Sequence, residues 1–176
     1  MRFVIFETKF GFFGILGDER GILRTSLPVK DRRTVENDLL AGVAGAEFDP
    51  KLFFGLQNQI KSYFSGTYVE FTAKTPLFIG HLSKFSQEIL KACLKIPYGQ
   101  TVSYGRLAEM ANRPKAARAV GNAMGNNPIP LIIPCHRVVK SDGSAGGFLR
   151  NSSGGPQLKK RLLELEKMHT PRISSR

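Results

Sequence analysis

Cysteine and histidine are scarce in this chain of 176 residues, which contains two cysteines, Cys93 and Cys135, and three histidines. Two cysteines can form at most one disulfide, so a disulfide-stapled secreted domain is excluded, and we interpret both as free thiols in a reducing compartment. No Cys-x-x-Cys or His-x-x-x-His spacing occurs among so few ligand side chains. The sequence therefore predicts no metal site, and nothing in it implies a cofactor.

Long apolar runs are absent as well, and no segment approaches the roughly 20 residues that a membrane helix needs. The chain reaches an acid at Glu7, which is too early for a secretory signal. Hydrophobic residues make up 41% and charged residues 23%, a composition typical of a soluble globular protein. We expect a cytoplasmic protein whose length fits one large domain or two small ones.

Acidic residues are scarce in only one part of the chain. Residues 1–80 hold ten Lys/Arg and nine Asp/Glu, a net charge of +1, whereas residues 81–176 hold sixteen and five, a net charge of +11. Such an asymmetry favours a polyanionic partner for the second half, most simply nucleic acid. The alternative is a basic surface that serves solubility alone.

The first half, residues 1–75, is rich in Phe, Gly, Thr and Val, with short apolar stretches between turn residues. The pattern predicts strands at residues 3–6, 12–16, 21–24 and 68–71, and helices at 34–40 and 52–64. This half is expected to be a small structural domain that contains a sheet. Thr75 and Pro76 mark a linker to a mostly helical domain over residues 76–176, so the predicted fold class is α/β (α+β).

Two short helices in the second half form a helix-turn-helix candidate. Ser103 can cap the first helix, and Asn112 suits its left-handed closing position. Pro114 suits the first turn of a second helix over residues 115–124. Small side chains on that second helix would let its backbone approach another surface closely. A helical hairpin packed into the core is the alternative.

Cys135 is the candidate reactive group. It lies between apolar segments, next to His136 and Arg137, whose positive charge would lower the pKa of the thiol and favour the nucleophilic thiolate. Cys93, in contrast, shares the apolar face of a predicted helix and is interpreted as a packed core thiol. Because neighbouring side chains in an extended segment point to opposite faces, Cys135 and His136 need a third group to act together.

The last helix, predicted over residues 157–168, supplies a candidate for that group. Glu166 lies on its apolar stripe, whereas Glu164 faces away. A carboxylate on a buried face needs a partner, which His136 or a Lys or Arg side chain can provide. With His136 as the partner, a Cys–His–Glu chain results, in which Glu166 orients the imidazole and His136 helps to remove the thiol proton.

The segment from about residue 85 to residue 168 resembles the O6-alkylguanine-DNA alkyltransferases, or methylated-DNA–protein-cysteine methyltransferases. The most specific element is Ile-Pro-Cys-His-Arg-Val at 133–138, supported by Pro-Tyr-Gly at 97–99, Thr-Val-Ser-Tyr at 101–104, the run 114–121 and Asn-Pro at 127–128. The resemblance implies DNA repair in which the alkyl group of O6-alkylguanine, or of O4-alkylthymine, moves irreversibly to Cys135. It further implies one reaction per molecule, base flipping, and a monomer that binds the minor groove of double-stranded DNA.

The resemblance also implies a role for each matching residue. Those acting on the acceptor would be Cys135, His136 (through a water), Glu166 and Asn127. Those lining the guanine pocket would be Tyr104, Met124, the Val138 backbone, Phe148 and Ser153. Those contacting DNA would be Arg118, which would fill the place of the flipped base, Tyr104, which would help to rotate the nucleotide, Arg113 and Ser141.

One loop departs from the family pattern. The segment after Gly146-Gly147 is longer than usual, which changes the register of Ser153 as a donor to guanine O6, and Phe148 replaces a tyrosine. Two other functions are left open by the residues. A module that binds alkylated bases without transfer would lack the acceptor cysteine. A turnover cysteine hydrolase on an unrelated fold would leave the helix-turn-helix and the basic half unexplained.

Overall fold

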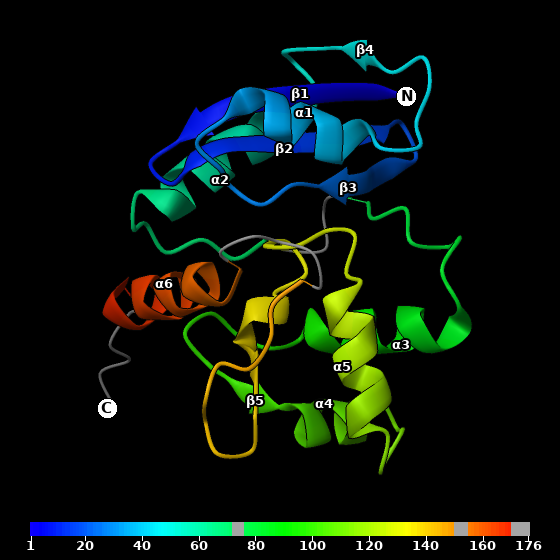
Figure 1. The fold of residues 1–176 in the computed structure, drawn as a ribbon, viewed down its shortest axis with the longest axis vertical. Coiled ribbons are helices and arrows are strands. Elements are labelled where there is room, and N and C mark those ends of the chain that lie inside the picture. The colour runs from blue at the N-terminus through cyan, green and yellow to red at the C-terminus, as the bar shows by residue number, and fades with distance from the viewer. Residues whose placement is uncertain (72–75, 150–154, 170–176) are drawn as a thin grey trace.

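The structure, a computed structural model, describes residues 1–71, 76–149 and 155–169. A four-stranded sheet with two helices forms its first half, and a mostly helical assembly lies against that sheet (Figure 1). The first half contains β1 (Arg2–Thr8), β2 (Gly11–Asp18), β3 (Gly21–Thr25), α1 (Arg32–Leu40), β4 (Glu47–Phe48) and α2 (Phe54–Phe64). The second half contains α3 (Lys84–Cys93), β5 (Val102–Ser103), α4 (Tyr104–Met110), α5 (Ala117–Gly125), the 3-10 turn η1 (Cys135–Arg137), β6 (Val138–Val139) and α6 (Gly155–His169). The expected fold class is confirmed.

The sheet has the order β3-β2-β1-β4, with β1 antiparallel to β2 and parallel to β4. Alternate side chains of β1 point to opposite faces. Phe3 and Ile5 pack with α1, whereas Val4 and Phe6 join the larger core that contains α2 and the second half. α1 begins after Asp31, whose carboxylate accepts hydrogen bonds from two backbone N–H groups of the first turn. The predicted strands at 3–6, 12–16 and 21–24 and both predicted helices are confirmed.

The strand predicted at residues 68–71 is wrong, because these residues form no regular element and the fourth strand of the sheet is β4. The Tyr68 ring packs edge-on against Tyr98, with centroids 4.9 Å apart, and its hydroxyl donates to Glu70 at 2.6 Å. These contacts hold the segment beside the second half. After residue 76 the chain first pairs with β3, where Ile22 donates to the Pro76 carbonyl at 2.8 Å. The domain boundary at residue 75 stays a prediction.

A single hydrophobic core connects the two halves. Ile15 and Ile22 of the sheet and Phe64 of α2 belong to the same buried cluster as Leu107 of α4 and Ile133, which precedes Cys135. All five side chains are at most 1% exposed. Burial of this much apolar surface is the main force that holds the sheet against the helices. None of the described helices is long and apolar enough to span a membrane.

The helix-turn-helix is formed by α4 and α5. Ser103 caps α4 by accepting a hydrogen bond from the Arg106 N–H at 3.0 Å, and Asn112 has a left-handed φ of 55°, as predicted. The second helix begins at Ala117, two residues later than predicted. Lys115 has a φ of 69°, which is incompatible with an α-helix, so the chain turns once more before α5 starts.

Candidate active site

Cys135 lies in a short turn that one asparagine stabilises. The backbone N–H of Cys135 and the side-chain Nδ2 of Asn127 both donate to the carbonyl of Ile133, at 2.7 and 3.0 Å. The Oδ1 atom of Asn127 accepts from the Ile129 N–H at 3.0 Å. The sequence placed Cys135 in an extended segment, but the 3-10 turn has only about three residues per turn. Successive side chains of the turn therefore do not point to opposite faces.

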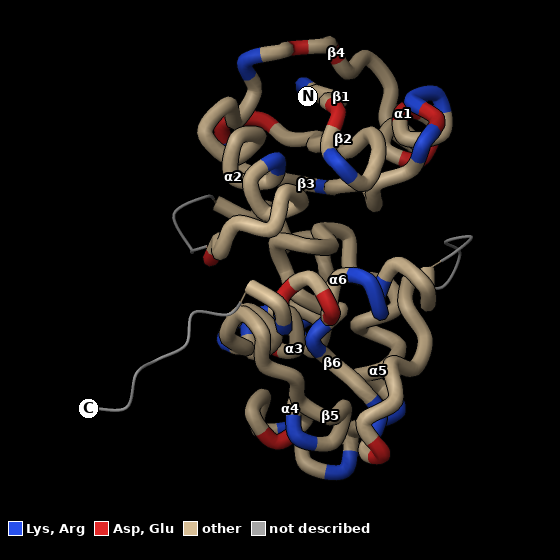
Figure 2. Tube along the Cα trace, turned by 90° about the vertical axis from the view of Figure 1, so that its left-hand side faces the viewer, with Lys and Arg blue, Asp and Glu red and all other residues tan. Residues whose placement is uncertain are grey.

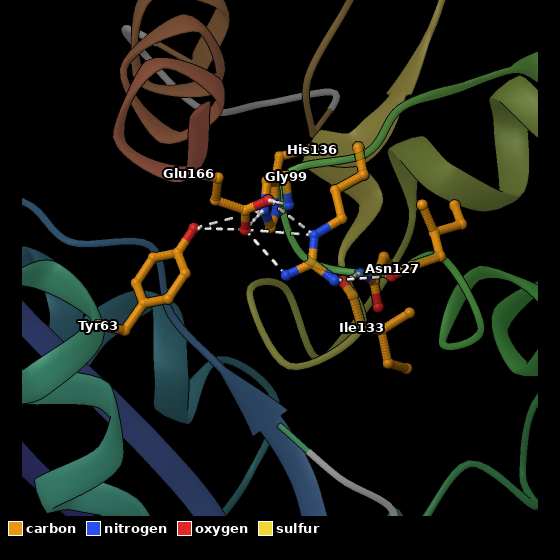
Figure 3. Close-up of polar contacts among 8 residues, drawn as sticks. Tyr63, Gly99, Asn127, Ile133, His136 and Glu166 are labelled. Carbon is orange, nitrogen blue, oxygen red and sulfur yellow. Dashed lines mark hydrogen bonds and ion pairs between the residues drawn. The ribbon is translucent and has the colours of Figure 1, made fainter. Parts of the chain in front are cut away.

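The carboxylate of Glu166 is the centre of a buried hydrogen-bond network (Figure 3). Its Oε1 atom accepts from Tyr63 Oη at 2.8 Å and pairs with His136 Nε2 at 2.8 Å. Arg137 donates to Oε1 through Nη2 at 2.9 Å and to Oε2 through Nε at 2.9 Å. The Gly99 N–H donates to Oε2 at 2.9 Å. The sequence offered His136 or an Arg as the partner of Glu166, and the structure contains both pairs.

The network fixes the charge of Glu166. Burial by itself would raise the pKa of this carboxyl, but hydrogen bonds from His136 and Arg137, together with the positive charge of Arg137, outweigh burial and lower the pKa to about 2. Arg137 is also anchored by donating to the Ile96 carbonyl at 2.7 Å. Glu166 is therefore an anion that accepts hydrogen bonds and does not donate one.

This assignment decides which nitrogen of His136 carries the proton. Because the Glu166 carboxylate only accepts, Nε2 of His136 is the protonated nitrogen, and Nδ1 presents a lone pair. Burial lowers the pKa of His136, so the ring is neutral at physiological pH. Nδ1 is buried and has no hydrogen-bond partner within the described residues. A buried base with a free lone pair is suited to accept a proton from a neighbouring thiol.

The predicted low pKa of Cys135 is wrong for the resting protein. Burial raises the pKa of this thiol to about 11, although a hydrogen bond from Asn127 and the charge of Lys159 lower it in part. The guanidinium of Arg137, which was expected to favour the thiolate, is paired with Glu166 instead. Cys135 is 2% exposed and rests as a neutral thiol, so the thiolate has to form during the reaction.

A pocket of about 440 Å³ opens onto Cys135, a volume within the range of small-ligand sites. Its lining residues include Tyr104, Met124 and Phe148, three of the residues to which the resemblance gave a place in the guanine pocket. The parallel pairing of β5 with β6, in which Val102 lies opposite Val138, brings the start of α4 next to the cysteine turn. The two short strands thus bring the Thr-Val-Ser-Tyr motif at 101–104 next to the Ile-Pro-Cys-His-Arg-Val motif at 133–138.

Lys159 is a buried residue of the site that the sequence analysis missed. Its ammonium donates to the carbonyls of Val138 and Gly147 and lies 5.7 Å from the Tyr104 ring centroid. Burial lowers its pKa to about 8. The residue precedes Glu166 by seven positions, about two turns of the same helix, so the two residues share one face. The apolar stripe that predicted a buried Glu166 could therefore have predicted a buried Lys159 as well. Among the described residues, no three His, Cys, Asp or Glu side chains form a metal-binding group.

The chain is similar to known proteins over most of its length. Residues 84–168 match the family model of the 6-O-methylguanine DNA methyltransferase DNA-binding domain. A methylated-DNA–protein-cysteine methyltransferase of Mycobacterium bovis is 45% identical over 123 residues, which are 70% of each chain. One of Methanosarcina acetivorans is 33% identical over 94% of this chain and 98% of its own.

The chain belongs to the methylated-DNA–protein-cysteine methyltransferase family. The crystal structure of Mycobacterium tuberculosis OGT in complex with DNA is 34% identical and superimposes with a TM-score of 0.77. That match covers 98% of this chain and 96% of the other. The resemblance stated from the motifs is therefore confirmed, and it extends over the first half as well.

The remaining residues with family-implied roles lie at the surface or away from the pocket. Arg118 is exposed in the first turn of α5, and Ser141 is exposed in the turn after β6. Arg113 is exposed but forms an ion pair with Glu88 at 2.7 Å. Val138 is buried outside the described lining of the pocket, and its carbonyl accepts from Lys159. Ser153 lies outside the described residues.

Proposed function

We propose that this protein repairs O6-alkylguanine in DNA, and O4-alkylthymine, by transferring the alkyl group to Sγ of Cys135 after the base is flipped into the adjoining pocket. The observation that carries the proposal is the juxtaposition of a buried thiol, a neutral histidine with a free Nδ1, and an ionised Glu166 behind it. Family membership favours transfer over a binding module or an unrelated hydrolase.

The proposed reaction balances without a cofactor. The thiol proton leaves Cys135 for Nδ1 of His136 through a water, and Glu166 stabilises the imidazolium through Nε2. The thiolate attacks the alkyl carbon, the new S–C bond forms, and the C–O6 bond breaks. The departing base takes up a proton, for which the Tyr104 hydroxyl is the candidate donor, and the proton held by His136 then returns through water to Tyr104, so that both side chains end neutral. The resulting thioether is stable, and we propose that each molecule reacts once.

DNA binding is assigned to the second half. Several Lys and Arg positions lie along and near α4, α5 and β5 at the end of the molecule far from the sheet, together with a few Asp and Glu positions (Figure 2). A paired base hides its O6 atom, and flipping it costs a few kcal/mol. We propose that Arg118 at the start of α5 fills the vacated place, while Tyr104 helps to rotate the nucleotide. Phosphate contacts by Arg113 require it to leave Glu88.

We further propose that the protein acts as a monomer on the minor groove of double-stranded DNA. The relative solved in complex with DNA supports a DNA partner. The small side chains of α5, among them Ala119 and Gly121, permit close approach to a groove. We also propose that the protein is located in the cytoplasm.

Incubation with a duplex that contains O6-methylguanine, followed by intact-mass measurement, tests the proposal. The protein should gain the mass of one CH2 unit, because a methyl group replaces the thiol hydrogen. Cys135→Ala should gain nothing, whereas Cys93→Ala, which removes the other buried thiol, should react like the parent protein. Unmodified protein that still binds the duplex tightly would favour the binding module, and repeated turnover would favour the hydrolase.

A further inference from the structure

We propose that Tyr63, from the first half of the chain, is a positioning residue for alkyl transfer, because its hydroxyl holds the Glu166 carboxylate against His136. This inference rests on the proposed function of Cys135. The first half then takes part in the reaction that the second half performs, although the sequence assigned to it a structural role alone.

The contact is short and fully enclosed. Tyr63 is 0% exposed, and its hydroxyl donates to Glu166 Oε1 at 2.8 Å and lies 3.4 Å from His136 Nε2. Figure 3 shows the tyrosine reaching Glu166 from the first half of the chain. The hydroxyl therefore lies next to both atoms of the Glu166–His136 hydrogen bond, Oε1 and Nε2. A hydrogen bond to a buried, charged carboxylate contributes more free energy than a hydrogen bond between two neutral groups.

The ring of Tyr63 is held by its neighbours. It packs edge-on against Phe64 and Tyr98, with centroids 5.4 and 6.0 Å away. The ends of α2 and α6 also lie in close contact, because a Cβ atom on Gly66 would come within 2.7 Å of His169. A fixed ring on one helix and a carboxylate on the other give the hydroxyl one defined position.

Tyr63 is suited to donate and not to ionise. Burial, and next the charge of Glu166, raise its pKa well above the ordinary value of a tyrosine. The hydroxyl stays protonated throughout the pH range in which His136 titrates. The other titratable or charged groups that face His136 and Glu166 are Arg137, Lys159, Cys135 and Tyr98.

Tyr63→Phe removes the hydroxyl and leaves the ring, and Tyr98→Phe is the matched control. Both tyrosines are buried and adjacent, but the Tyr98 hydroxyl has no hydrogen-bond partner within the described residues. Tyr63→Phe should slow transfer from both duplex DNA and free O6-benzylguanine by roughly tenfold, because it acts on the acceptor and not on DNA binding. Tyr98→Phe should react at the parent rate.

The titration of His136 separates positioning from mere packing. Without the Tyr63 hydroxyl, the Glu166 carboxylate is held less firmly against Nε2–H and stabilises the imidazolium less, so Tyr63→Phe should lower the pKa of His136 by up to about one unit. Imidazole nitrogen NMR measures this pKa, and Tyr98→Phe should leave it unchanged. A parent rate, or a slow rate with an unchanged pKa of His136, would overturn the inference. If the parent protein itself transfers nothing, the proposed function fails instead.

The unmodified protein gives a test that does not depend on a variant folding. The hydroxyl proton of Tyr63 should exchange slowly and move downfield of an unbonded hydroxyl, because it is buried against a carboxylate. Its resonance should shift as His136 titrates, whereas that of Tyr98 should shift far less. A Tyr63 resonance that does not respond to the titration of His136 would contradict the proposal.

Discussion

The second half of the chain carries a net charge of +11 and places its reactive residues within short motifs, whereas the first half has a net charge of +1 and no catalytic motif. Cys135, His136 and Arg137 are consecutive, and Glu166 follows His136 by 30 residues. The first half nevertheless reaches the site twice. Tyr63 donates to Glu166 across 103 residues, and Thr25 donates to the Pro130 carbonyl across 105 residues.

The two halves differ in role: the second half supplies the reacting groups, and the first half supplies groups that hold them in place. A nucleophile, a base and a DNA-binding helix need particular residue types in a particular order, so they leave a pattern in the sequence. Support needs only one donor at the right place and a core that excludes water. A rigid environment from which water is excluded strengthens each electrostatic contact inside it. We therefore expect the largest effect from a substitution in the second half.

Glu166→Ala should have the largest effect. It leaves the charge of Arg137 buried without its carboxylate, which should lower the free energy of unfolding by about 3–5 kcal/mol, and it should slow alkyl transfer by roughly a hundredfold. Urea unfolding and transfer to free O6-benzylguanine measure the two effects. Glu164→Ala, on the exposed face of the same helix, is the control and should change neither.

The pH dependence of stability sharpens this prediction. The pKa of Glu166 is lowered from 4.5 to about 2 in the folded state, so its contribution to stability is complete above about pH 4.5 and is lost as the pH falls to about 2. Glu166→Gln should lose that pH-dependent contribution, and the parent protein should keep it. Equal acid unfolding of both proteins would contradict a charged Glu166 at the centre of the network.

Local pattern predicted much of the molecule. Turn residues between short apolar stretches identified three strands, and the apolar stripe of the last helix identified Glu166 as buried. The raised pKa of Cys135 was not predictable, because it depends on how completely the fold covers the thiol. Tyr63 was not predictable either, since a single tyrosine in an apolar helix reads as core packing until its tertiary partner is known. β4 was missed because a strand of two residues is too short to show the alternation of apolar and polar side chains that predicts a strand.

Arg118→Ala should have an intermediate effect that is confined to duplex DNA. If the guanidinium fills the place of the flipped base, its loss should slow repair of duplex by roughly tenfold and leave the reaction with free O6-benzylguanine unchanged. Lys9→Ala removes an exposed charge from the first half and should alter neither rate. Equal losses with both substrates would move Arg118 from DNA binding to the acceptor chemistry. An equal loss in Lys9→Ala would extend the DNA-binding surface to the first half.

Thr25→Val should have the smallest effect. Its hydroxyl donates to the Pro130 carbonyl at 2.9 Å, and its N–H donates to the Pro128 carbonyl at 3.0 Å, within the loop that connects Asn127 with Cys135. Loss of the hydroxyl should lower the free energy of unfolding by about 1 kcal/mol. It should also slow transfer a few-fold, because the loop that orients the acceptor becomes less fixed.

Thr8→Val is the matched control, because the Thr8 hydroxyl donates to the Gly11 carbonyl at 2.7 Å within the β1–β2 hairpin and does not contact the acceptor loop. Both variants should lose similar stability, as measured by urea unfolding, but only Thr25→Val should react more slowly with free O6-benzylguanine. If both variants react at the parent rate, Tyr63 but not Thr25 would support alkyl transfer from the first half. A slower reaction in both would mean that the acceptor responds to the stability of the sheet as a whole, and the role of Thr25 would then not be specific.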